Sequence, residues 1–238
     1  MKLVANQDER DLASMLRGLL AARRADPGHD LAAAGVLGLG LPEAHGGSGG
    51  TLADLGIFAR EAGRALCPMS VHSTVFAAQA IHALGGEQAR ARWLPGLAAG
   101  RASATTALWN ANDAADVVPV LRADNAGDGW RLHGTADFVA DAETAQVIVV
   151  SATDGDGRTL GFVAPTDHPG VTLRPLALMG GHRAACVRFD DVAVDEVLGD
   201  GGALSGEQLR RVANIAIALT SLDLVGVGEA VLDRTVEY

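Results

Sequence analysis

The feature that most constrains this chain is its hydrophobic period, which changes from helical to β and back along 238 residues. Up to about residue 102, apolar residues recur every three or four positions, as on one face of a helix. From about residue 103, short β-rich runs alternate with Gly/Asp turns, and the helical period returns after Gly201-Gly202. This order predicts an α+β chain in three parts, with boundaries near residues 102 and 203.

Start signals place the helices of the first part. Asn6, with Glu9 three residues later, forms a capping-box pattern. Five apolar residues follow at the spacing of one helix face: Leu12, Met15, Leu16, Leu19 and Leu20. Thr51 is expected to cap a later helix, which ends before Pro68 and has an apolar face made of Leu52, Leu55, Phe58 and Ala62. Further helices are predicted over 30–36, 70–84 and 87–99, and an irregular loop over 41–50.

The second part contains short runs that favour strands. They lie at 117–121, 130–132, 146–151, 160–164, 171–173 and 186–189. Turn signals at 125–129 and 154–157 separate some of them, a pattern typical of an antiparallel β-domain or barrel. The third part, from about residue 204 to 238, is predicted to be one helix whose apolar face needs a partner to cover it.

Composition excludes several classes of function. The net charge is -10 and Lys2 is the single lysine, so nucleic-acid binding is not expected. The N-terminus lacks a basic start followed by an apolar run, and the longest apolar stretch, 214–222, is too short to span a bilayer. A soluble cytoplasmic protein without a membrane span is therefore expected. Cys67 and Cys186 are expected to be reduced and buried.

Six segments, in order, carry a resemblance to a known family. They read GLGLPEAHGGSG at 38–49, LGGEQARARWLPGLAAG at 84–100, WRLHG at 130–134, GFVAP at 161–165 with PGV at 169–171, FDDVAV at 189–194 with LG at 198–199, and LVG at 224–226 followed by VLD at 231–233 and Tyr238. Each is a weak signal alone, but together they cover almost the whole chain. The chain therefore resembles the acyl-CoA dehydrogenase family.

The resemblance implies both an architecture and a chemistry. It implies an N-terminal α-helical domain over 1–102, a middle β-domain over 103–203, and the first helix of an incomplete C-terminal bundle over 204–238. Family members bind FAD between the β-domain and the bundle, usually as tetramers, and act on acyl-CoA substrates, as in fatty acid β-oxidation. A carboxylate base removes the α-proton while the β-hydride passes to the flavin, and the electrons leave to an electron-transfer flavoprotein.

Site positions carried over from the family are partly substituted. The resemblance implies that the cofactor contacts are Thr105, Thr106, Phe138 and Ala140, and that Asn112 and Asn214 lie near the substrate. Ala140 stands where the family has a residue with a hydroxyl group. The missing hydrogen bond to the flavin would weaken the binding free energy of the cofactor by about 1 kcal/mol. Trp109 adds bulk to the stretch 106–113, which contains Thr106 and Asn112. It is either a structural tryptophan or a stacking group for a ring.

No catalytic base is identified. The family's alternative base position, on the first bundle helix, falls at Ala216, and its neighbouring arginine falls at Ile217. The acids on that helix are interpreted as a solvated face: Glu207, Asp223, Glu229 and Glu237. The seven histidines show no metal-ligand spacing, so no metal site is expected.

Three hypotheses remain open. The chain is part of a flavin-dependent acyl-CoA dehydrogenase, or it is a non-catalytic partner that completes another dehydrogenase subunit in a heteromer. The third hypothesis is a truncated homologue that folds poorly. It predicts exposed apolar surface along one helix and aggregation of the isolated chain. The residues expected to form that surface are Ile215, Leu219, Leu222 and Val225.

Overall fold

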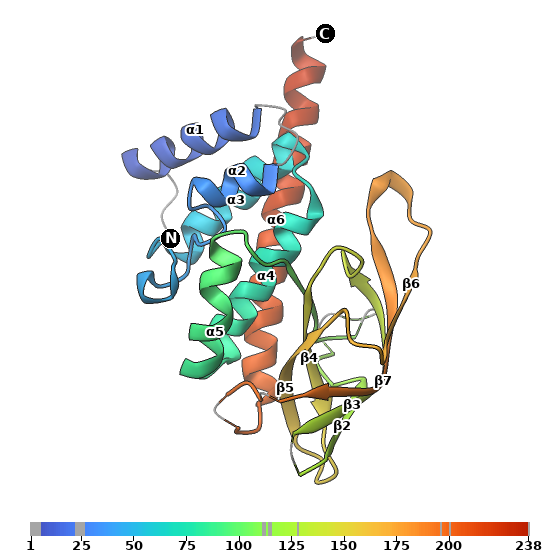
Figure 1. Ribbon diagram of the computed structural model, residues 1–238. Coiled ribbons are helices and arrows are strands. Elements are labelled where there is room, and N and C mark those ends of the chain that lie inside the picture. The colour runs from blue at the N-terminus through green and yellow to red at the C-terminus, as the bar shows by residue number, and fades with distance from the viewer. Residues whose placement is uncertain are drawn as a thin grey trace.

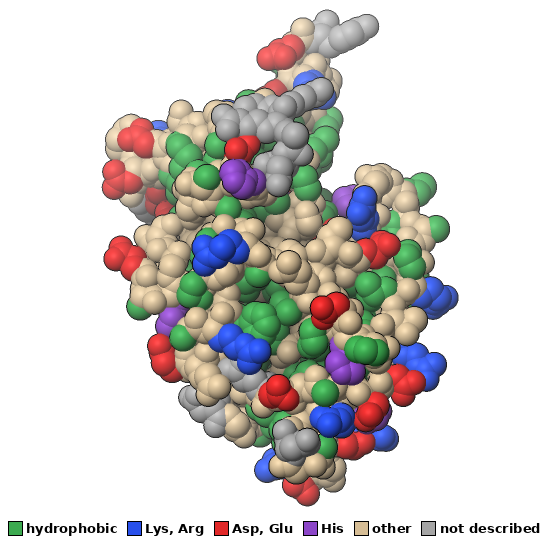
Figure 2. Space-filling model, viewed as in Figure 1, with side chains coloured by type: hydrophobic (Ala, Val, Ile, Leu, Met, Phe, Trp, Pro, Cys, Tyr) green, Lys and Arg blue, Asp and Glu red, His purple; other side chains and the backbone are tan. Residues whose placement is uncertain are grey.

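The computed structural model has five α-helices, then a curled sheet, then one long helix, α6 (Figure 1). It describes residues 6–21, 27–110, 113, 116–127, 129–195, 197–199 and 201–237. The order of elements confirms the predicted α+β class, with a helical first part, a β-rich second part and a helix at the end. Figure 2 shows hydrophobic side chains reaching the surface between the helical part and the sheet.

The helices of the first part are α1 Gln7–Ala21, α2 Pro27–Ala33, α3 Leu52–Ala65, α4 Met69–Leu84 and α5 Glu87–Ala98. The predicted capping box at Asn6 and the predicted cap at Thr51 are both present, and Thr51 forms a capping box as well. The amide of Glu9 donates to Oδ1 of Asn6 at 2.8 Å, and Thr51 exchanges the equivalent bonds with Asp54. Three details differ from expectation. Met15 and Leu52 are exposed rather than buried, α2 begins before residue 30, and the loop over 41–50 contains a short 3-10 turn.

The sheet has seven strands in mixed orientation. They are β1 Ala104–Ala107, β2 Leu121–Asn125, β3 Trp130–Ala140, β4 Val147–Thr153, β5 Thr159–Pro165, β6 Val171–Pro175 and β7 Ala184–Val194. The order is β1-β4-β2-β3-β7-β6, with β5 paired to β4. The expectation of an antiparallel domain was wrong at β4, which runs parallel to both β1 and β2. Strand β1 was not predicted, and the run at 117–120 lies outside β2.

Three hydrophobic clusters hold these parts together. One fills the inside of the curled sheet around Phe162 and Phe189. A second lies where α4 and α5 meet β4, β5 and the first half of α6. The third joins α1, α3 and α6 through Leu16, Phe58 and Leu219. Because α6 contributes to two of the clusters, its burial links the helical part to the sheet.

Helix α6 spans Gly206–Glu237 and packs mainly along α3. Among the described residues it is the one helix that is long and apolar enough, by length and composition, to cross a membrane. The expectation based on the stretch 214–222 therefore underestimated the length of the apolar segment. The expected exposed surface was also wrong in part. Leu219 is buried, and Ile215 and Leu222 pack against the helical core. Val225 is exposed, as expected.

Charged side chains also join α6 to α3. Glu229 forms ion pairs with Arg60 and Arg64, and Asp233 accepts a hydrogen bond from Arg64 at 2.6 Å. The interpretation of Glu229 as part of a solvated face was therefore wrong. These pairs hold the pKa of Glu229 below its usual range, chiefly through the hydrogen bond from Arg60.

Candidate functional site

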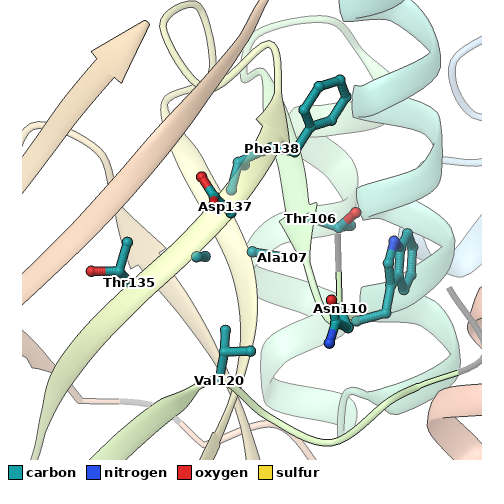
Figure 3. A pocket seen from close by; sticks show the side chains of 10 residues that line it. Thr106, Ala107, Asn110, Val120, Thr135, Asp137 and Phe138 are labelled. Atoms are coloured by element: carbon teal, nitrogen blue, oxygen red, sulfur yellow. The ribbon is translucent and has the colours of Figure 1, made fainter. Parts of the chain in front are cut away.

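A cavity of about 190 Å³ lies where β1 and the end of β3 meet the segment that follows β1 (Figure 3). We call it the Phe138 cavity. Its lining is Thr106, Ala107, Trp109, Asn110, Val120, Thr135, Ala136, Asp137, Phe138 and Val139. Two of the predicted cofactor residues, Thr106 and Phe138, thus meet at one cavity although they lie on different strands.

A bulge in β3 turns Phe138 outward. Between Ala136 and Val139 the pairing with β7 shifts by one residue, so β3 carries an extra residue there. Phe138 has a φ of 53°, in the left-handed region that non-glycine residues rarely adopt, and its side chain is 53% exposed. The strain of such a residue, on the order of 1 kcal/mol, is typical of functional positions. The bulge thus leaves an aromatic ring exposed at the cavity.

Thr105 and Ala140 support the wall behind this cavity. Successive residues of a strand point to opposite faces, so Thr105 is buried where Thr106 is not. The Thr105 hydroxyl donates a hydrogen bond to the Ala140 carbonyl oxygen at 2.7 Å. This bond ties β1 to the end of β3. Neither residue is among the described side chains that line the cavity.

A second cavity, of about 280 Å³, lies against α6, and we call it the α6 cavity. Its lining is Phe76, Trp109, Ala213, Ala216, Ile217, Thr220 and Ser221. Among these described residues none carries a carboxylate. Ala216 and Ile217, the positions of the family's alternative base and its arginine, do face this cavity. Sequence reasoning missed Phe76 and Thr220, although the spacing of 213, 216, 217 and 220 marks one helix face.

The two predicted substrate residues are not brought into these cavities. Asn214 is exposed on α6 and is not part of the described lining of either one. Asn112 lies outside the described residues.

A third cavity, of about 660 Å³, lies between the α3–α4 turn, the loop before β7 and the middle of α6. Asp141, Asp223 and Arg183 contribute charges to it. Burial raises the pKa of Asp141, although the Ser73 hydroxyl, which donates to it at 2.7 Å, acts in the opposite direction. Cys67 also lines this cavity, half-buried rather than fully buried as expected, and burial raises its pKa to about 12. The thiol is therefore an unreactive one.

Metal chemistry gains no support from the geometry. Within the ranges that the structure describes, no group of three or more His, Cys, Asp or Glu side chains is arranged to hold a metal ion.

The sequence is similar to known acyl-CoA dehydrogenases. A family profile described as the acyl-CoA dehydrogenase N-terminal domain matches residues 20–101. The acyl-CoA dehydrogenase FadE12 of Mycobacterium tuberculosis is 31% identical over 223 residues, which cover 86% of this chain and 55% of the relative. This chain spans about half the length of the curated relatives it matches.

Several solved structures share this fold. The Tcur3481-Tcur3483 steroid ACAD variant is 28% identical, with a TM-score of 0.84 over 98% of this chain and 66% of the other. A glutaryl-CoA dehydrogenase from Mycobacterium smegmatis in complex with FADH2 shares the fold at 24% identity, with a TM-score of 0.83 and coverage of 98% and 66%. The ChsE4-ChsE5 complex from Mycobacterium tuberculosis shares it at 21% identity, with a TM-score of 0.85 and coverage of 100% and 68%.

Proposed function

Because the chain belongs to the acyl-CoA dehydrogenase family, we propose that it supplies the cofactor-side half of an FAD-dependent site that dehydrogenates an acyl-CoA thioester between its α and β carbons. The observation that carries this proposal is the Phe138 cavity, in which an exposed ring and the Thr106 hydroxyl lie together. A cytoplasmic location and an oligomeric assembly are part of the same proposal.

The side chains around this cavity suit the ring of a flavin. Phe138 offers an apolar face for a planar ring to stack on, and Thr106 offers a hydroxyl that can donate to or accept from its polar edge. Thr105 and Ala140 fix the wall behind through their own hydrogen bond. When bound, FAD would accept the β-hydride and pass the electrons on to an electron-transfer flavoprotein.

The α6 cavity suits the acyl part of the substrate. Its walls are mostly apolar, so they would bury methylene groups and exclude water beside the reacting carbons. None of its described lining residues is a carboxylate that could take the α-proton. In this proposal the base comes from outside these 238 residues.

That observation also favours a second candidate function. With Ala216 and Ile217 at the family's alternative base and arginine positions, the chain suits the role of a non-catalytic partner that completes another acyl-CoA dehydrogenase in a heteromer. The shared fold with the ChsE4-ChsE5 complex is in keeping with such an assembly.

The visible absorption spectrum of the purified chain tests both candidates. It should be recorded for the chain alone and after co-expression with a dehydrogenase subunit encoded next to it. A flavin spectrum from the chain alone supports the enzyme. A spectrum that develops only with the partner, and is lost when this chain carries Phe138→Ala while the partner's base is intact, supports the shared site. The absence of flavin under both conditions contradicts both candidates.

A further inference from the structure

Trp109 is the one described residue that lines both the Phe138 cavity and the α6 cavity. Its side chain is half-buried and packs against the core cluster formed by α4, α5 and α6. The indole is therefore a wall shared by the cavity assigned to the cofactor and the cavity assigned to the acyl group.

The backbone on both sides of Trp109 is held in place. Leu108 is fully buried, and its carbonyl oxygen accepts a hydrogen bond from the buried Ser151 hydroxyl at 3.5 Å. The amide of Asn110 donates to the carbonyl oxygen of Asp116 at 2.9 Å, and the Asn110 side chain donates to the Asp116 carboxylate at 3.1 Å. These hydrogen bonds hold the backbone on both sides of Trp109, and the indole itself packs against the core cluster.

We propose that Trp109 is a flavin-stacking residue: its indole provides a second aromatic surface, besides Phe138, for a flavin ring bound in the Phe138 cavity. This inference rests on the proposed function. A large aromatic side chain at this position supplies stacking area in the cavity that Phe138 also lines. The residue also lines the α6 cavity, so it limits how far an acyl group bound there can approach the flavin ring.

The indole has a chemical property that gives the inference its test. Trp is electron-rich and quenches the emission of a flavin stacked on it, whereas Phe stacks without quenching. A purely structural tryptophan would affect stability but not the emission of the bound flavin. The probes are FAD and riboflavin, titrated into the purified full chain, and the readouts are affinity and the emission of the bound flavin.

Wild-type protein is expected to bind both probes with strongly quenched flavin emission. Trp109→Phe should keep the affinity within about threefold while the bound flavin becomes several times brighter, because a stacked ring is retained. Trp109→Ala should weaken binding about tenfold, the typical loss of one aromatic stacking surface. If Trp109→Ala unfolds the protein, the emission of the flavin bound to Trp109→Phe is sufficient to show whether the indole stacks on the flavin.

Matched controls come from the other two tryptophans. Trp93 packs beneath Arg92 and Trp130 beside Phe162, and neither is among the described residues lining the two cavities. Trp93→Phe and Trp130→Phe should change neither readout. Unchanged emission and affinity in both Trp109 variants, with binding lost in Phe138→Ala, would overturn this inference and leave the proposed function standing. A wild-type chain that binds neither probe, alone or together with the co-expressed dehydrogenase subunit, would overturn both.

Discussion

At the scale of single residues, His72 has the most constrained environment. The residue is 2% exposed, and its ring stacks on Phe58 at a centroid distance of 5.8 Å and meets Phe76 edge to face at 6.2 Å. Nε2 lies 3.4 Å from Oδ1 of Asp223 but makes no aligned hydrogen bond. Burial lowers the pKa of His72 and outweighs the attraction of Asp223 and Asp141 for a proton. The imidazole is therefore neutral in the folded protein at neutral pH.

A neutral buried histidine makes stability depend on pH with a definite sign. The unfolded chain takes up a proton at His72 below about pH 6.5, and the folded chain does so only at lower pH. The stabilisation is therefore complete above about pH 6.5 and is lost as the pH falls, by about 1.4 kcal/mol for each unit of pKa difference. In His72→Gln the free energy of unfolding, measured by urea titration between about pH 7 and pH 5, should fall less on acidification than in wild type.

Two further variants check the assignment. The pKa of His82 is also lowered by burial, but His82 is only half-buried, so His82→Gln should remove less of the slope than His72→Gln. Asp141 has a raised pKa, and its effect has the opposite sign, because stability is then lost as the pH rises. Asp141→Asn should therefore steepen the loss on acidification. An unaltered slope in His72→Gln would contradict the neutral assignment.

At the scale of elements, α3 and α6 cross at a distance set by glycines. A Cβ atom on Gly226 would overlap the carbonyl oxygen of Arg60, and one on Gly63 would overlap the carbonyl oxygen of Asp223. Backbone touches backbone at this crossing, which brings Arg60 and Arg64 within reach of Glu229. The close contact explains why small residues occur in helices that otherwise favour larger ones.

The glycine contact predicts an asymmetric pair of substitutions on one helix. Gly226→Ala should lower the free energy of unfolding by about 2–3 kcal/mol, because the two backbones must move apart. Gly228→Ala should leave stability unchanged or raise it by up to about 1 kcal/mol, since its Cβ would meet nothing within 4 Å and alanine favours helix. Urea titration of both variants and of the wild type measures the free energy of unfolding. Equal effects of the two would show that the helix crossing is not tightly packed.

At the scale of the whole molecule, one side of α6 carries an uncovered apolar surface. It carries exposed side chains over several turns: Ile217, Leu224, Val225, Val231, Leu232 and Val236. In Figure 1 the last turns of α6 extend beyond the other helices. An apolar stripe of this kind favours self-association of the isolated chain.

Replacing part of this stripe should lower self-association without loss of stability. Leu224→Lys together with Leu232→Lys is expected to shift the sedimentation distribution toward monomer, because both side chains are more than half exposed and contribute little to the core. Val118→Lys, at an exposed valine that does not line either cavity against α6, serves as the control and should have no effect. Sedimentation velocity over a range of concentrations measures the result. An unchanged distribution in the double variant would show that association occurs elsewhere.

The sequence alone determined what depends on near neighbours along the chain. Local hydrogen bonding explains the caps at Asn6 and Thr51. Helical spacing predicts the extents of α4 and α5 to within one residue. The order of the helical and β-rich parts and the family assignment also followed from the sequence, because motifs and hydrophobic periodicity are properties of consecutive residues. The division into domains near residues 102 and 203 stays a prediction. So do the site residues: Thr105, Thr106, Phe138 and Ala140 for the cofactor, and Asn112 and Asn214 for the substrate.

Only the tertiary structure decided what depends on residues far apart. Strand β1 is too short and polar to be recognised, and it forms because it pairs with β4 about forty residues later. The exposed ring of Phe138 results from a bulge against β7, which no local pattern encodes. Likewise, the place of Trp109 between two cavities depends on how α6 packs against the sheet. Burial and long-range pairing are collective properties of the folded chain, and a single sequence does not specify them position by position.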